Sequence, residues 1–191
     1  MTRLDVVAGP NGAGKSTFVA TVLAALLPGS VFVNADEIAR QRWPDDPEAH
    51  AYDAARVAAD TRAHLISARR PFIAETVFSH PSKLDLIRTA RAAGYTVVVH
   101  VVLVPEDLAV ERVRLRVQTG GPAVPEDKIR ERYRRLWGLV AAAIAESDSA
   151  MVYDNSAGVG PRIVATMSAG QIIGAPSWPA WTPPPLHSQQ Q

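Results

Sequence analysis

Residues 9–17 carry a glycine-rich phosphate-binding signature, G-x-x-x-x-G-K-[S/T], which they match in full. The stretch 4–8 before them is short and apolar, as in a buried strand, and residues 18–27 after them are rich in helix formers. A strand, a glycine loop and a helix in this order bring backbone N–H groups and the positive end of the helix to one point, where phosphate oxygens bind. A glycine-rich turn without a ligand is the alternative, but it does not account for Lys15 and Ser16 at the spacing of the signature. We therefore predict that the chain binds a nucleoside triphosphate.

Individual residues of this loop have predicted roles. Lys15 is expected to reach the β- and γ-phosphates, and the Ser16 hydroxyl is expected to be a ligand of Mg²⁺. The sequence lacks the N-K-x-D signature of guanine-specific proteins, which favours ATP as the nucleotide. The residues predicted to surround the phosphates are Gly9, Pro10, Asn11, Gly12, Ala13, Gly14, Lys15, Ser16 and Thr17.

Length and composition favour a single domain with a mixed surface. The chain has 191 residues, no cysteine, and a formal net charge of +1 with acids and bases interspersed. A nucleic-acid surface usually has a clustered basic excess, so we do not expect nucleic acid as a partner. The first strand begins almost at once, and no apolar run approaches the about 20 residues of a membrane span. We therefore expect a cytoplasmic protein without a signal peptide or membrane contact.

Apolar strand candidates alternate with helical stretches along the chain. This alternation predicts parallel strands joined by right-handed crossovers, which is the three-layer α/β fold of P-loop NTPases and kinases, with helices on both faces. We expect a mostly parallel sheet of five strands, and a small hairpin at 162–167 and 171–174. The five predicted strands are residues 4–8, 31–33, 72–74, 95–104 and 150–153.

One domain is expected over residues 1–174, with a helical lid at about 112–135. The tail, residues 175–191, is rich in proline and ends in three glutamines. This composition is typical of a segment without a fixed fold, although Trp178 and Trp181 could pack back on the body. The prediction is one folded unit followed by a tail.

Asp36 follows the second predicted strand. In parallel α/β sheets, ligands bind beyond the carboxyl ends of the strands, so a polar residue at this point is a candidate site residue. Its carboxylate could accept the proton of a hydroxyl group that attacks the γ-phosphate. Asp36 could also be the N-cap of a helix that starts at Glu37, and the two interpretations are compatible.

Glu75 and Thr76 end the third predicted strand. Glu75 is the acid best placed after a hydrophobic strand to lie near Mg²⁺ or the substrate, and Thr76 can hydrogen-bond a substrate or a water on the metal. An exposed strand end is the alternative for both residues. Asp154 and Asn155 follow the last strand, where an adenine-side loop and an ordinary turn fit equally well.

Two arginine-rich helices flank the break at residues 120–122, Gly-Gly-Pro. Arg112 and Arg116 are four residues apart and share one face of the first helix. Guanidinium groups on a hinged lid can hold the γ-phosphoryl group and neutralise charge in the transition state. Arginines interspersed with glutamates are also typical of a solvated helix face. We expect at least one arginine from each helix to act at the site, and the candidates on the second helix are Arg130, Arg132, Arg134 and Arg135.

These motifs together resemble the zeta-toxin family of P-loop kinases, in its short bacterial form, over about residues 4–156. The resemblance implies a kinase that depends on ATP and Mg²⁺ and acts on a hydroxyl group of a small molecule. The best-known members phosphorylate the 3′-hydroxyl of the sugar in UDP-N-acetylglucosamine and related nucleotide sugars. The resemblance also raises an antitoxin protein as a candidate partner. The motifs that carry it are residues 9–17, 34–39, 75–76, 111–117, 120–121, 124–126, 132–133 and 153–156.

The resemblance also implies roles by position. It makes Asp36 the base for the acceptor hydroxyl. Two departures from the family pattern bear on the substrate pocket: Pro122 stands where short members often have histidine, and Val77 follows Thr76 where a second hydroxyl residue is common. The implied phosphate and metal contacts are Lys15 and Ser16, the substrate-side strand end is Glu75 and Thr76, and the phosphate-contacting lid residues are Arg112, Arg116 and Arg132.

Two other functions remain as alternatives to a small-molecule kinase. An ATP-hydrolysing switch protein would hydrolyse ATP at a rate that no metabolite changes. A kinase of RNA or DNA ends would need a basic track for the nucleic-acid backbone. The lid arginines are the only residues of the sequence that could form such a track.

Overall fold

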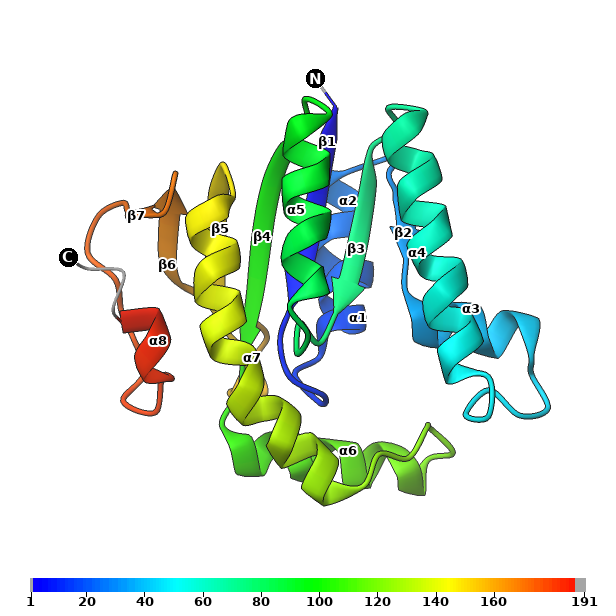
Figure 1. The fold of residues 1–191 in the computed structure, drawn as a ribbon. Coiled ribbons are helices and arrows are strands. Elements are labelled where there is room, and N and C mark those ends of the chain that lie inside the picture. The colour runs from blue at the N-terminus through cyan, green and yellow to red at the C-terminus, as the bar shows by residue number, and fades with distance from the viewer. Residues whose placement is uncertain (1, 188–191) are drawn as a thin grey trace.

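One sheet of seven strands forms the centre of the fold (Figure 1). The computed structural model describes residues 2–187. The strands are β1 (Arg3–Ala8), β2 (Val31–Val33), β3 (Phe72–Thr76), β4 (Thr96–Leu103), β5 (Ser149–Asp154), β6 (Arg162–Ser168) and β7 (Gln171–Ile172). They are ordered β2-β3-β1-β4-β5-β6-β7 across the sheet. The first five in this order pair in parallel, and β6 and β7 pair antiparallel.

The expected number of five strands is wrong, because the sheet continues beyond β5. β6 pairs antiparallel with β5, with Ala165 opposite Val152, and β7 pairs with β6. An edge strand leaves N–H and C=O groups without partners, and a hairpin laid against it provides them. Val164 and Met167 of β6 are buried in the same core as the parallel strands. The hairpin expected near the end of the chain therefore forms and extends the main sheet.

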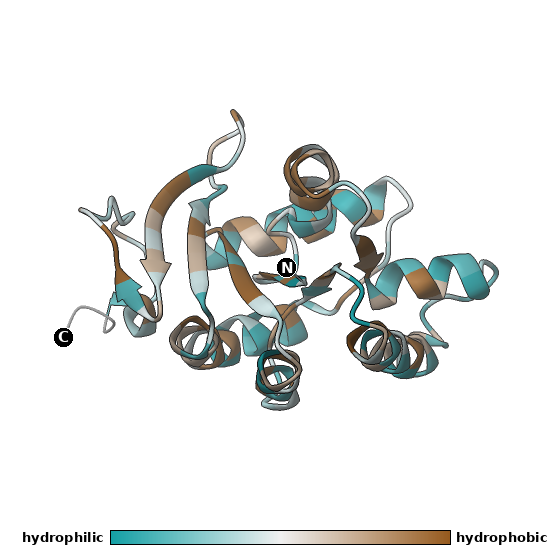
Figure 2. Cartoon of the chain, turned by 90° about the horizontal axis from the view of Figure 1, so that it is seen from above, coloured by the Kyte–Doolittle hydropathy of each residue, from teal (hydrophilic) through white to brown (hydrophobic). Residues whose placement is uncertain are grey.

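Helices cover both faces of the sheet. They are α1 (Lys15–Phe18), continued by a π-helical turn (Val19–Leu23) and α2 (Ala24–Leu26), then α3 (Ala35–Arg42), α4 (Ala51–Ser67), α5 (Ser82–Ala92), α6 (Glu106–Gln118), α7 (Glu126–Glu146) and α8 (Pro184–His187). In Figure 1, α4, α5 and α7 lie in front of the sheet, and α1 and α2 lie behind it. Seen from above, helices flank a twisted sheet whose strands carry hydrophobic residues, in brown (Figure 2). The predicted three-layer α/β fold is confirmed.

The core is centred on β1 and β4. Every side chain of β4 from Val97 to Leu103 is buried, including that of His100. A parallel strand that is covered on both faces has no solvent side, so its sequence is a continuous apolar run. His100 is accommodated because its Nε2 lies 2.8 Å from Asp5 Oδ1, and Arg3 donates two hydrogen bonds to the same carboxylate. This buried pair joins β1 to β4.

The segment predicted to be a lid, about 112–135, comprises most of α6 and the first half of α7. From here on, we use the word lid for residues 106–135. It lies below the carboxyl ends of the parallel strands in Figure 1. Val110, Val113 and Ile129 form a small apolar cluster apart from the main core. Arg130 of α7 also forms ion pairs with three carboxylates, those of Glu106, Asp107 and Glu126. The two lid helices are therefore held together by contacts of their own.

Residues 175–187, which were expected to lack a fixed fold, pack on the body of the domain. Leu186 is fully buried, and Trp178 and Trp181 pack partly buried against the main core. Burial of these apolar side chains stabilises the packed segment, and its prolines reduce the conformational entropy that the segment loses on ordering. The remainder of the predicted tail, 188–191, lies outside the described residues. Within the described part of the chain, no helix is both long and apolar enough to cross a membrane.

Candidate active site

The glycine loop fits closely between β1, β4 and α6. A side chain on Gly9 would place its Cβ 2.5 Å from the carbonyl oxygen of Val102, and one on Gly12 would place it 2.4 Å from that of Ala109. Gly12 also has a φ of +75°, which favours glycine. Asn155 supports the loop from the end of β5, because its Nδ2 donates a hydrogen bond to the Ala13 carbonyl at 2.8 Å. The backbone of the loop is thus fixed by groups from three other parts of the chain.

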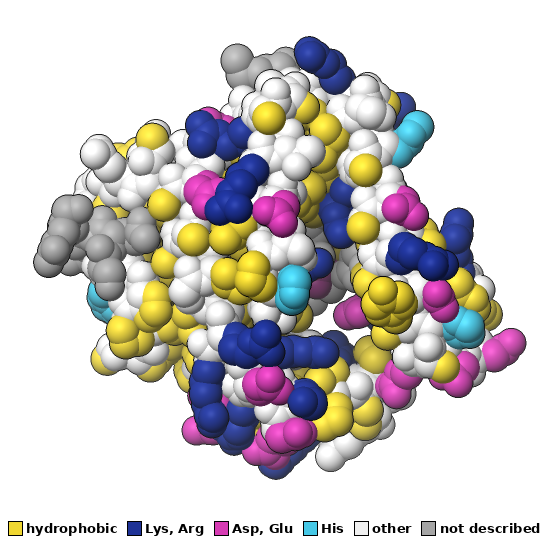
Figure 3. Space-filling model, viewed as in Figure 1, with side chains coloured by type: hydrophobic (Ala, Val, Ile, Leu, Met, Phe, Trp, Pro, Cys, Tyr) yellow, Lys and Arg dark blue, Asp and Glu magenta, His cyan; other side chains and the backbone are white. Residues whose placement is uncertain are grey.

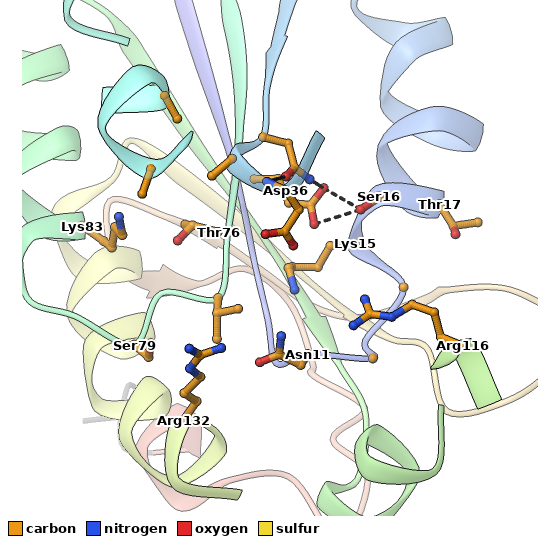
Figure 4. A pocket seen from close by; sticks show the side chains of 18 of the residues that line it. Asn11, Lys15, Ser16, Thr17, Asp36, Thr76, Ser79, Lys83, Arg116 and Arg132 are labelled. Atoms are coloured by element: carbon orange, nitrogen blue, oxygen red, sulfur yellow. Dashed lines mark hydrogen bonds between the residues drawn. The ribbon is translucent and has the colours of Figure 1, made fainter. Parts of the chain in front are cut away.

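Lys15 is buried at the start of α1, and its side chain points into the space beside Asp36 (Figure 4). Its Nζ donates a hydrogen bond to the Pro10 carbonyl at 2.9 Å. Burial lowers the pKa of Lys15, the charges of Glu75 and Asp36 oppose this effect, and Arg116 adds to it. An ammonium group has three donors, and this arrangement commits one of them to Pro10. The loop therefore holds a buried cation that lines the cavity and has donors left for a further partner.

Ser16 and Glu75 meet across the site, as Figure 4 shows. The Ser16 hydroxyl lies 2.8 and 3.0 Å from the two carboxylate oxygens of Glu75, and Asn34 Nδ2 donates to Glu75 Oε2 at 2.7 Å. A serine hydroxyl and a carboxylate are hard oxygen ligands of the kind that Mg²⁺ prefers. No group of three or more His, Cys, Asp or Glu within residues 2–187 could hold a metal ion. Mg²⁺ suits such a sparse site, because it keeps several waters and takes further ligands from substrate phosphates.

Asp36 lies in the first turn of α3 and does not cap the helix. The N-cap is Asn34, whose Oδ1 accepts hydrogen bonds from the backbone N–H groups of Asp36 (2.8 Å) and Glu37 (3.3 Å). The alternative interpretation of Asp36 as a cap is therefore wrong. Its carboxylate points toward Lys15 in Figure 4. The sequence analysis gave Asn34 no role of its own, although an asparagine three residues before a glutamate is a recognisable helix start.

A cavity of about 520 Å³ opens at this point, between the body and the lid. Figure 3 shows the hollow, with Lys and Arg side chains in dark blue along it. Thr76 lies on the side away from the glycine loop, and its hydroxyl oxygen accepts a hydrogen bond from the backbone of Phe78 at 3.2 Å. The predicted site residues that line the cavity are Asn11, Gly12, Gly14, Lys15, Ser16, Thr17, Asp36, Glu75, Thr76, Arg112, Arg116 and Arg132. Gly9, Pro10 and Ala13 of the loop are not part of its lining.

The lid arginines divide into two groups. Arg116 and Arg132 point their guanidinium groups into the cavity from opposite sides (Figure 4), and Arg116 also donates to the Pro122 carbonyl at 2.9 Å. Arg112 lines the cavity as well. The interpretation as a solvated, ion-paired face holds for the others, since Arg114, Arg130, Arg134 and Arg135 each pair with glutamates of the lid.

Several cavity residues were not predicted. Arg40 of α3, Arg62 of α4 and Lys83 of α5 line the cavity, together with Ser79 from the segment between β3 and α5. No motif marks them, because each sits in a helix or loop whose packing against the sheet decides where its side chain points. A second cavity of about 310 Å³ adjoins the first at Asp36. Most of its apolar lining comes from two stretches, residues 47–51 and 122–125, and its charged lining is Asp36, Arg40, Glu48, Arg116, Lys128 and Arg132.

The lid loop is tied to the segment before α4 by one hydrogen bond. The backbone N–H of Ala123 donates to the Glu48 carboxylate at 2.9 Å. Both residues line the second cavity. The lid loop and residues 47–51 thus enclose that cavity from two sides.

Sequence comparison identifies related proteins. The family model described as Zeta toxin matches residues 3–157. An uncharacterized protein of Haemophilus influenzae (strain ATCC 51907 / DSM 11121 / KW20 / Rd) is 29% identical over 126 residues, which are 65% of this chain and 88% of that protein. Residues 3–157, matched by the family model, contain all the predicted site residues.

Solved structures share the fold. The AvrRxo1-ORF1:AvrRxo1-ORF2 complex with ATP is similar with a TM-score of 0.71 at 13% identity, over 91% of this chain and 60% of the AvrRxo1 chain. A chain of the PezAT chromosomal toxin–antitoxin system of Streptococcus pneumoniae gives a TM-score of 0.64 at 14% identity, over 87% of this chain and 72% of that chain. Shikimate kinase from Acinetobacter baumannii gives 0.50 at 21% identity, over 75% and 80%. This chain therefore spans about 60% of the AvrRxo1 chain, and the likenesses establish a kinase-type α/β fold.

Proposed function

The chain belongs to the zeta toxin family, and from this premise we propose that it is a kinase that transfers the γ-phosphate of ATP to a hydroxyl group of a small molecule. The observation that carries the proposal is the position of Asp36. Its carboxylate points toward Lys15 in a cavity of about 520 Å³, a volume typical of small-molecule sites. The Ser16–Glu75 contact lies at the same place.

On the donor side, the glycine loop and Lys15 would bind the phosphates of ATP. Backbone N–H groups and the buried ammonium act where water is scarce, so their effect on a charged transition state is large. Arg116 and Arg132 would neutralise the charge of the phosphoryl group as it moves, with Arg112 beside them. Mg²⁺, when bound, would be held by Ser16 and Glu75 and would supply further positive charge to the phosphates.

On the acceptor side, Asp36 would orient the alcohol and take its proton. The O–H bond of the alcohol breaks, its oxygen forms the new bond to the γ-phosphorus, and the bond from that phosphorus to the β-phosphate oxygen breaks to release ADP. Closure of the lid over the cavity would exclude water, which competes as an acceptor and gives hydrolysis.

We further propose a nucleotide sugar, such as a UDP-N-acetyl sugar, as the acceptor. The second cavity, of about 310 Å³, supports this idea, because it lies next to Asp36 and is lined by both apolar and charged residues, as suits a ring that carries polar groups. We also propose an antitoxin protein as a partner, since the family is described as Zeta toxin and the PezAT neighbour comes from a toxin–antitoxin system.

Transfer of label from γ-labelled ATP tests the function. The protein is incubated with labelled ATP, Mg²⁺ and a panel of nucleotide sugars, dinucleotides and oligonucleotides, and the labelled product is identified. Label on a nucleotide sugar supports the full proposal. Hydrolysis that no compound changes would favour a switch protein, and label on oligonucleotide ends would favour a nucleic-acid kinase; either result overturns the proposal.

A further inference from the structure

Arg62 and Lys83 form a pair of cations on the cavity wall away from the glycine loop. Arg62 comes from α4 and Lys83 from α5, and both are half-buried residues that line the 520 Å³ cavity. Figure 4 shows Lys83 and Thr76 on one side of the cavity and Ser16 and Thr17 on the other. The pair thus lies on the acceptor side of the site.

Neither side chain has a hydrogen bond or an ion pair with a carboxylate anywhere in residues 2–187. The arginines nearby on the same two helices differ in this respect. Arg56 of α4 pairs with Asp53, and Arg88 of α5 pairs with Asp85 and Glu146. On these two helices, the cations without an acid partner are therefore the two that line the cavity.

The pair is electrostatically unfavourable as long as the cavity holds no anion near it. Burial lowers the pKa of both side chains, and the Arg62 charge lowers that of Lys83 further. A partly desolvated cation beside another cation costs free energy that a protein keeps mostly at functional sites. An anion placed between the two would remove both the repulsion and part of the desolvation penalty.

The charge of the whole cavity leads to the same conclusion. Seven cationic side chains line it, against the two carboxylates of Asp36 and Glu75, although the chain as a whole carries a net charge of only +1. The phosphates of ATP would meet Lys15 and the lid arginines. Arg62 and Lys83 on the far wall would then still lack an anion.

We propose that Arg62 and Lys83 form a subsite for an anionic group, a phosphate or a carboxylate, that the acceptor alcohol carries. The Thr76 hydroxyl can take part, because its oxygen accepts a hydrogen bond from Phe78 while its own O–H remains a donor. The subsite deepens the kinase function proposed above and rests on it. It makes the acceptor an anion and not a neutral alcohol, since a site built for charged partners rejects an analogue that lacks them.

Anion binding can be tested without knowing the acceptor. The donor side is filled with Mg²⁺ and the non-hydrolysable analogue AMP-PNP, and inorganic phosphate or acetate is titrated at constant ionic strength while the thermal unfolding midpoint is followed. We expect the wild type to be stabilised by at least one of the anions, and the choice between them identifies the group. The double variant Arg62→Gln/Lys83→Gln should lose this response, and Arg56→Gln, on the exposed side of α4, should keep it. A double variant that responds like the wild type, or a wild type that responds to neither anion, overturns the subsite.

Phosphoryl transfer provides the second test. Alcohols are offered in matched sets of neutral, carboxylated and phosphorylated forms (glycerol, glycerate and glycerol 3-phosphate, with sugars treated likewise). The anionic forms should take label faster, and the double variant should raise their KM by about 10–100-fold while kcat changes little, as expected for loss of charged hydrogen bonds. Neutral forms labelled equally fast would overturn the subsite and leave the kinase function standing. If γ-labelled ATP labels none of the compounds, although the first test shows that the protein binds AMP-PNP, the result counts against the kinase function, and the anion titration still decides on the subsite.

Discussion

The Glu75 carboxylate accepts a hydrogen bond of 2.8 Å from the Ser16 hydroxyl. This contact joins the end of β3 to the first turn of the helix after the glycine loop. Asn34 holds the same carboxylate at 2.7 Å while it caps α3. Three segments that are far apart in the sequence therefore converge where the phosphates and their metal ion would be bound.

Glu75→Gln should reduce phosphoryl transfer by about 10²-fold or more, because it keeps the shape of the side chain and removes the charge that would face Mg²⁺. The Mg²⁺ concentration needed for half-maximal rate should rise at the same time. Initial rates measured over a Mg²⁺ series check both effects. Glu37→Gln, at a residue of α3 that does not line the cavity, is the matched control, and equal behaviour of the two variants would contradict a role of Glu75 at the metal.

Lys15→Met should abolish transfer and yet stabilise the ligand-free protein, because folding buries the charge of Lys15. Since the pKa of Lys15 is lowered from 10.5, the unfolded chain binds more protons than the folded chain between the lowered pKa and 10.5. The contribution of Lys15 to the free energy of unfolding therefore rises with pH in that window, and this part of the rise should be missing in the variant. Urea unfolding of both proteins at pH 7 to 10 measures the difference. A variant less stable than the wild type at pH 7 would show that the Pro10 hydrogen bond outweighs desolvation.

Asp36→Asn should lower transfer by about 10²–10⁴-fold, the usual contribution of a general base. Its unfolding midpoint and its affinity for ATP should change little, since Asn34 and not Asp36 caps α3. Asn34→Ala, in contrast, should lower the free energy of unfolding by about 1 kcal/mol or more, because both the helix cap and a hydrogen bond to Glu75 disappear. Thermal unfolding and single-turnover transfer distinguish the two residues. Rapid transfer by Asp36→Asn would remove Asp36 from the chemistry.

Arg132→Gln should reduce kcat by about 10³-fold, the lower end of the range for an arginine that stabilises a transferred phosphoryl group. Arg135→Gln on the same helix should leave kcat within about twofold, because its guanidinium group pairs with Glu131 on the exposed face. Steady-state kinetics at saturating ATP compare the variants. Equal losses in both would mean that the lid is sensitive to any lost charge.

The residues that sequence reasoning found share one property, which is a fixed relation to a strand end. Asp36 and Glu75 directly follow apolar strands, and in a parallel sheet the carboxyl ends of strands meet at one edge, so their convergence with Lys15 could be expected. The order of strands and helices likewise determined the layers. The addition of β6 and β7 to the same sheet was not expected, because nothing in their residues says which edge a hairpin will join.

Arg62, Lys83 and Asp5 show what sequence reasoning could not reach. An arginine in an alanine-rich helix has the same local sequence whether it faces water or a cavity, and only the packing of α4 and α5 decides. Asp5 reads as an isolated acid in an apolar strand, and its partner His100 lies on another strand. Contacts of this kind depend on register between distant segments, which local patterns do not encode.

The conformation of the glycine loop, residues 9–17, depends on neighbouring elements as well as on its own sequence. Gly9 and Gly12 approach the carbonyls of Val102 and Ala109 so closely that no other side chain fits. The backbone path of the loop is therefore determined by β4 and α6 as much as by its own glycines. A chimera that contains only residues 9–17 of this protein would have the signature but should not bind phosphate. A chimera that also contains β4 and α6 should retain phosphate binding.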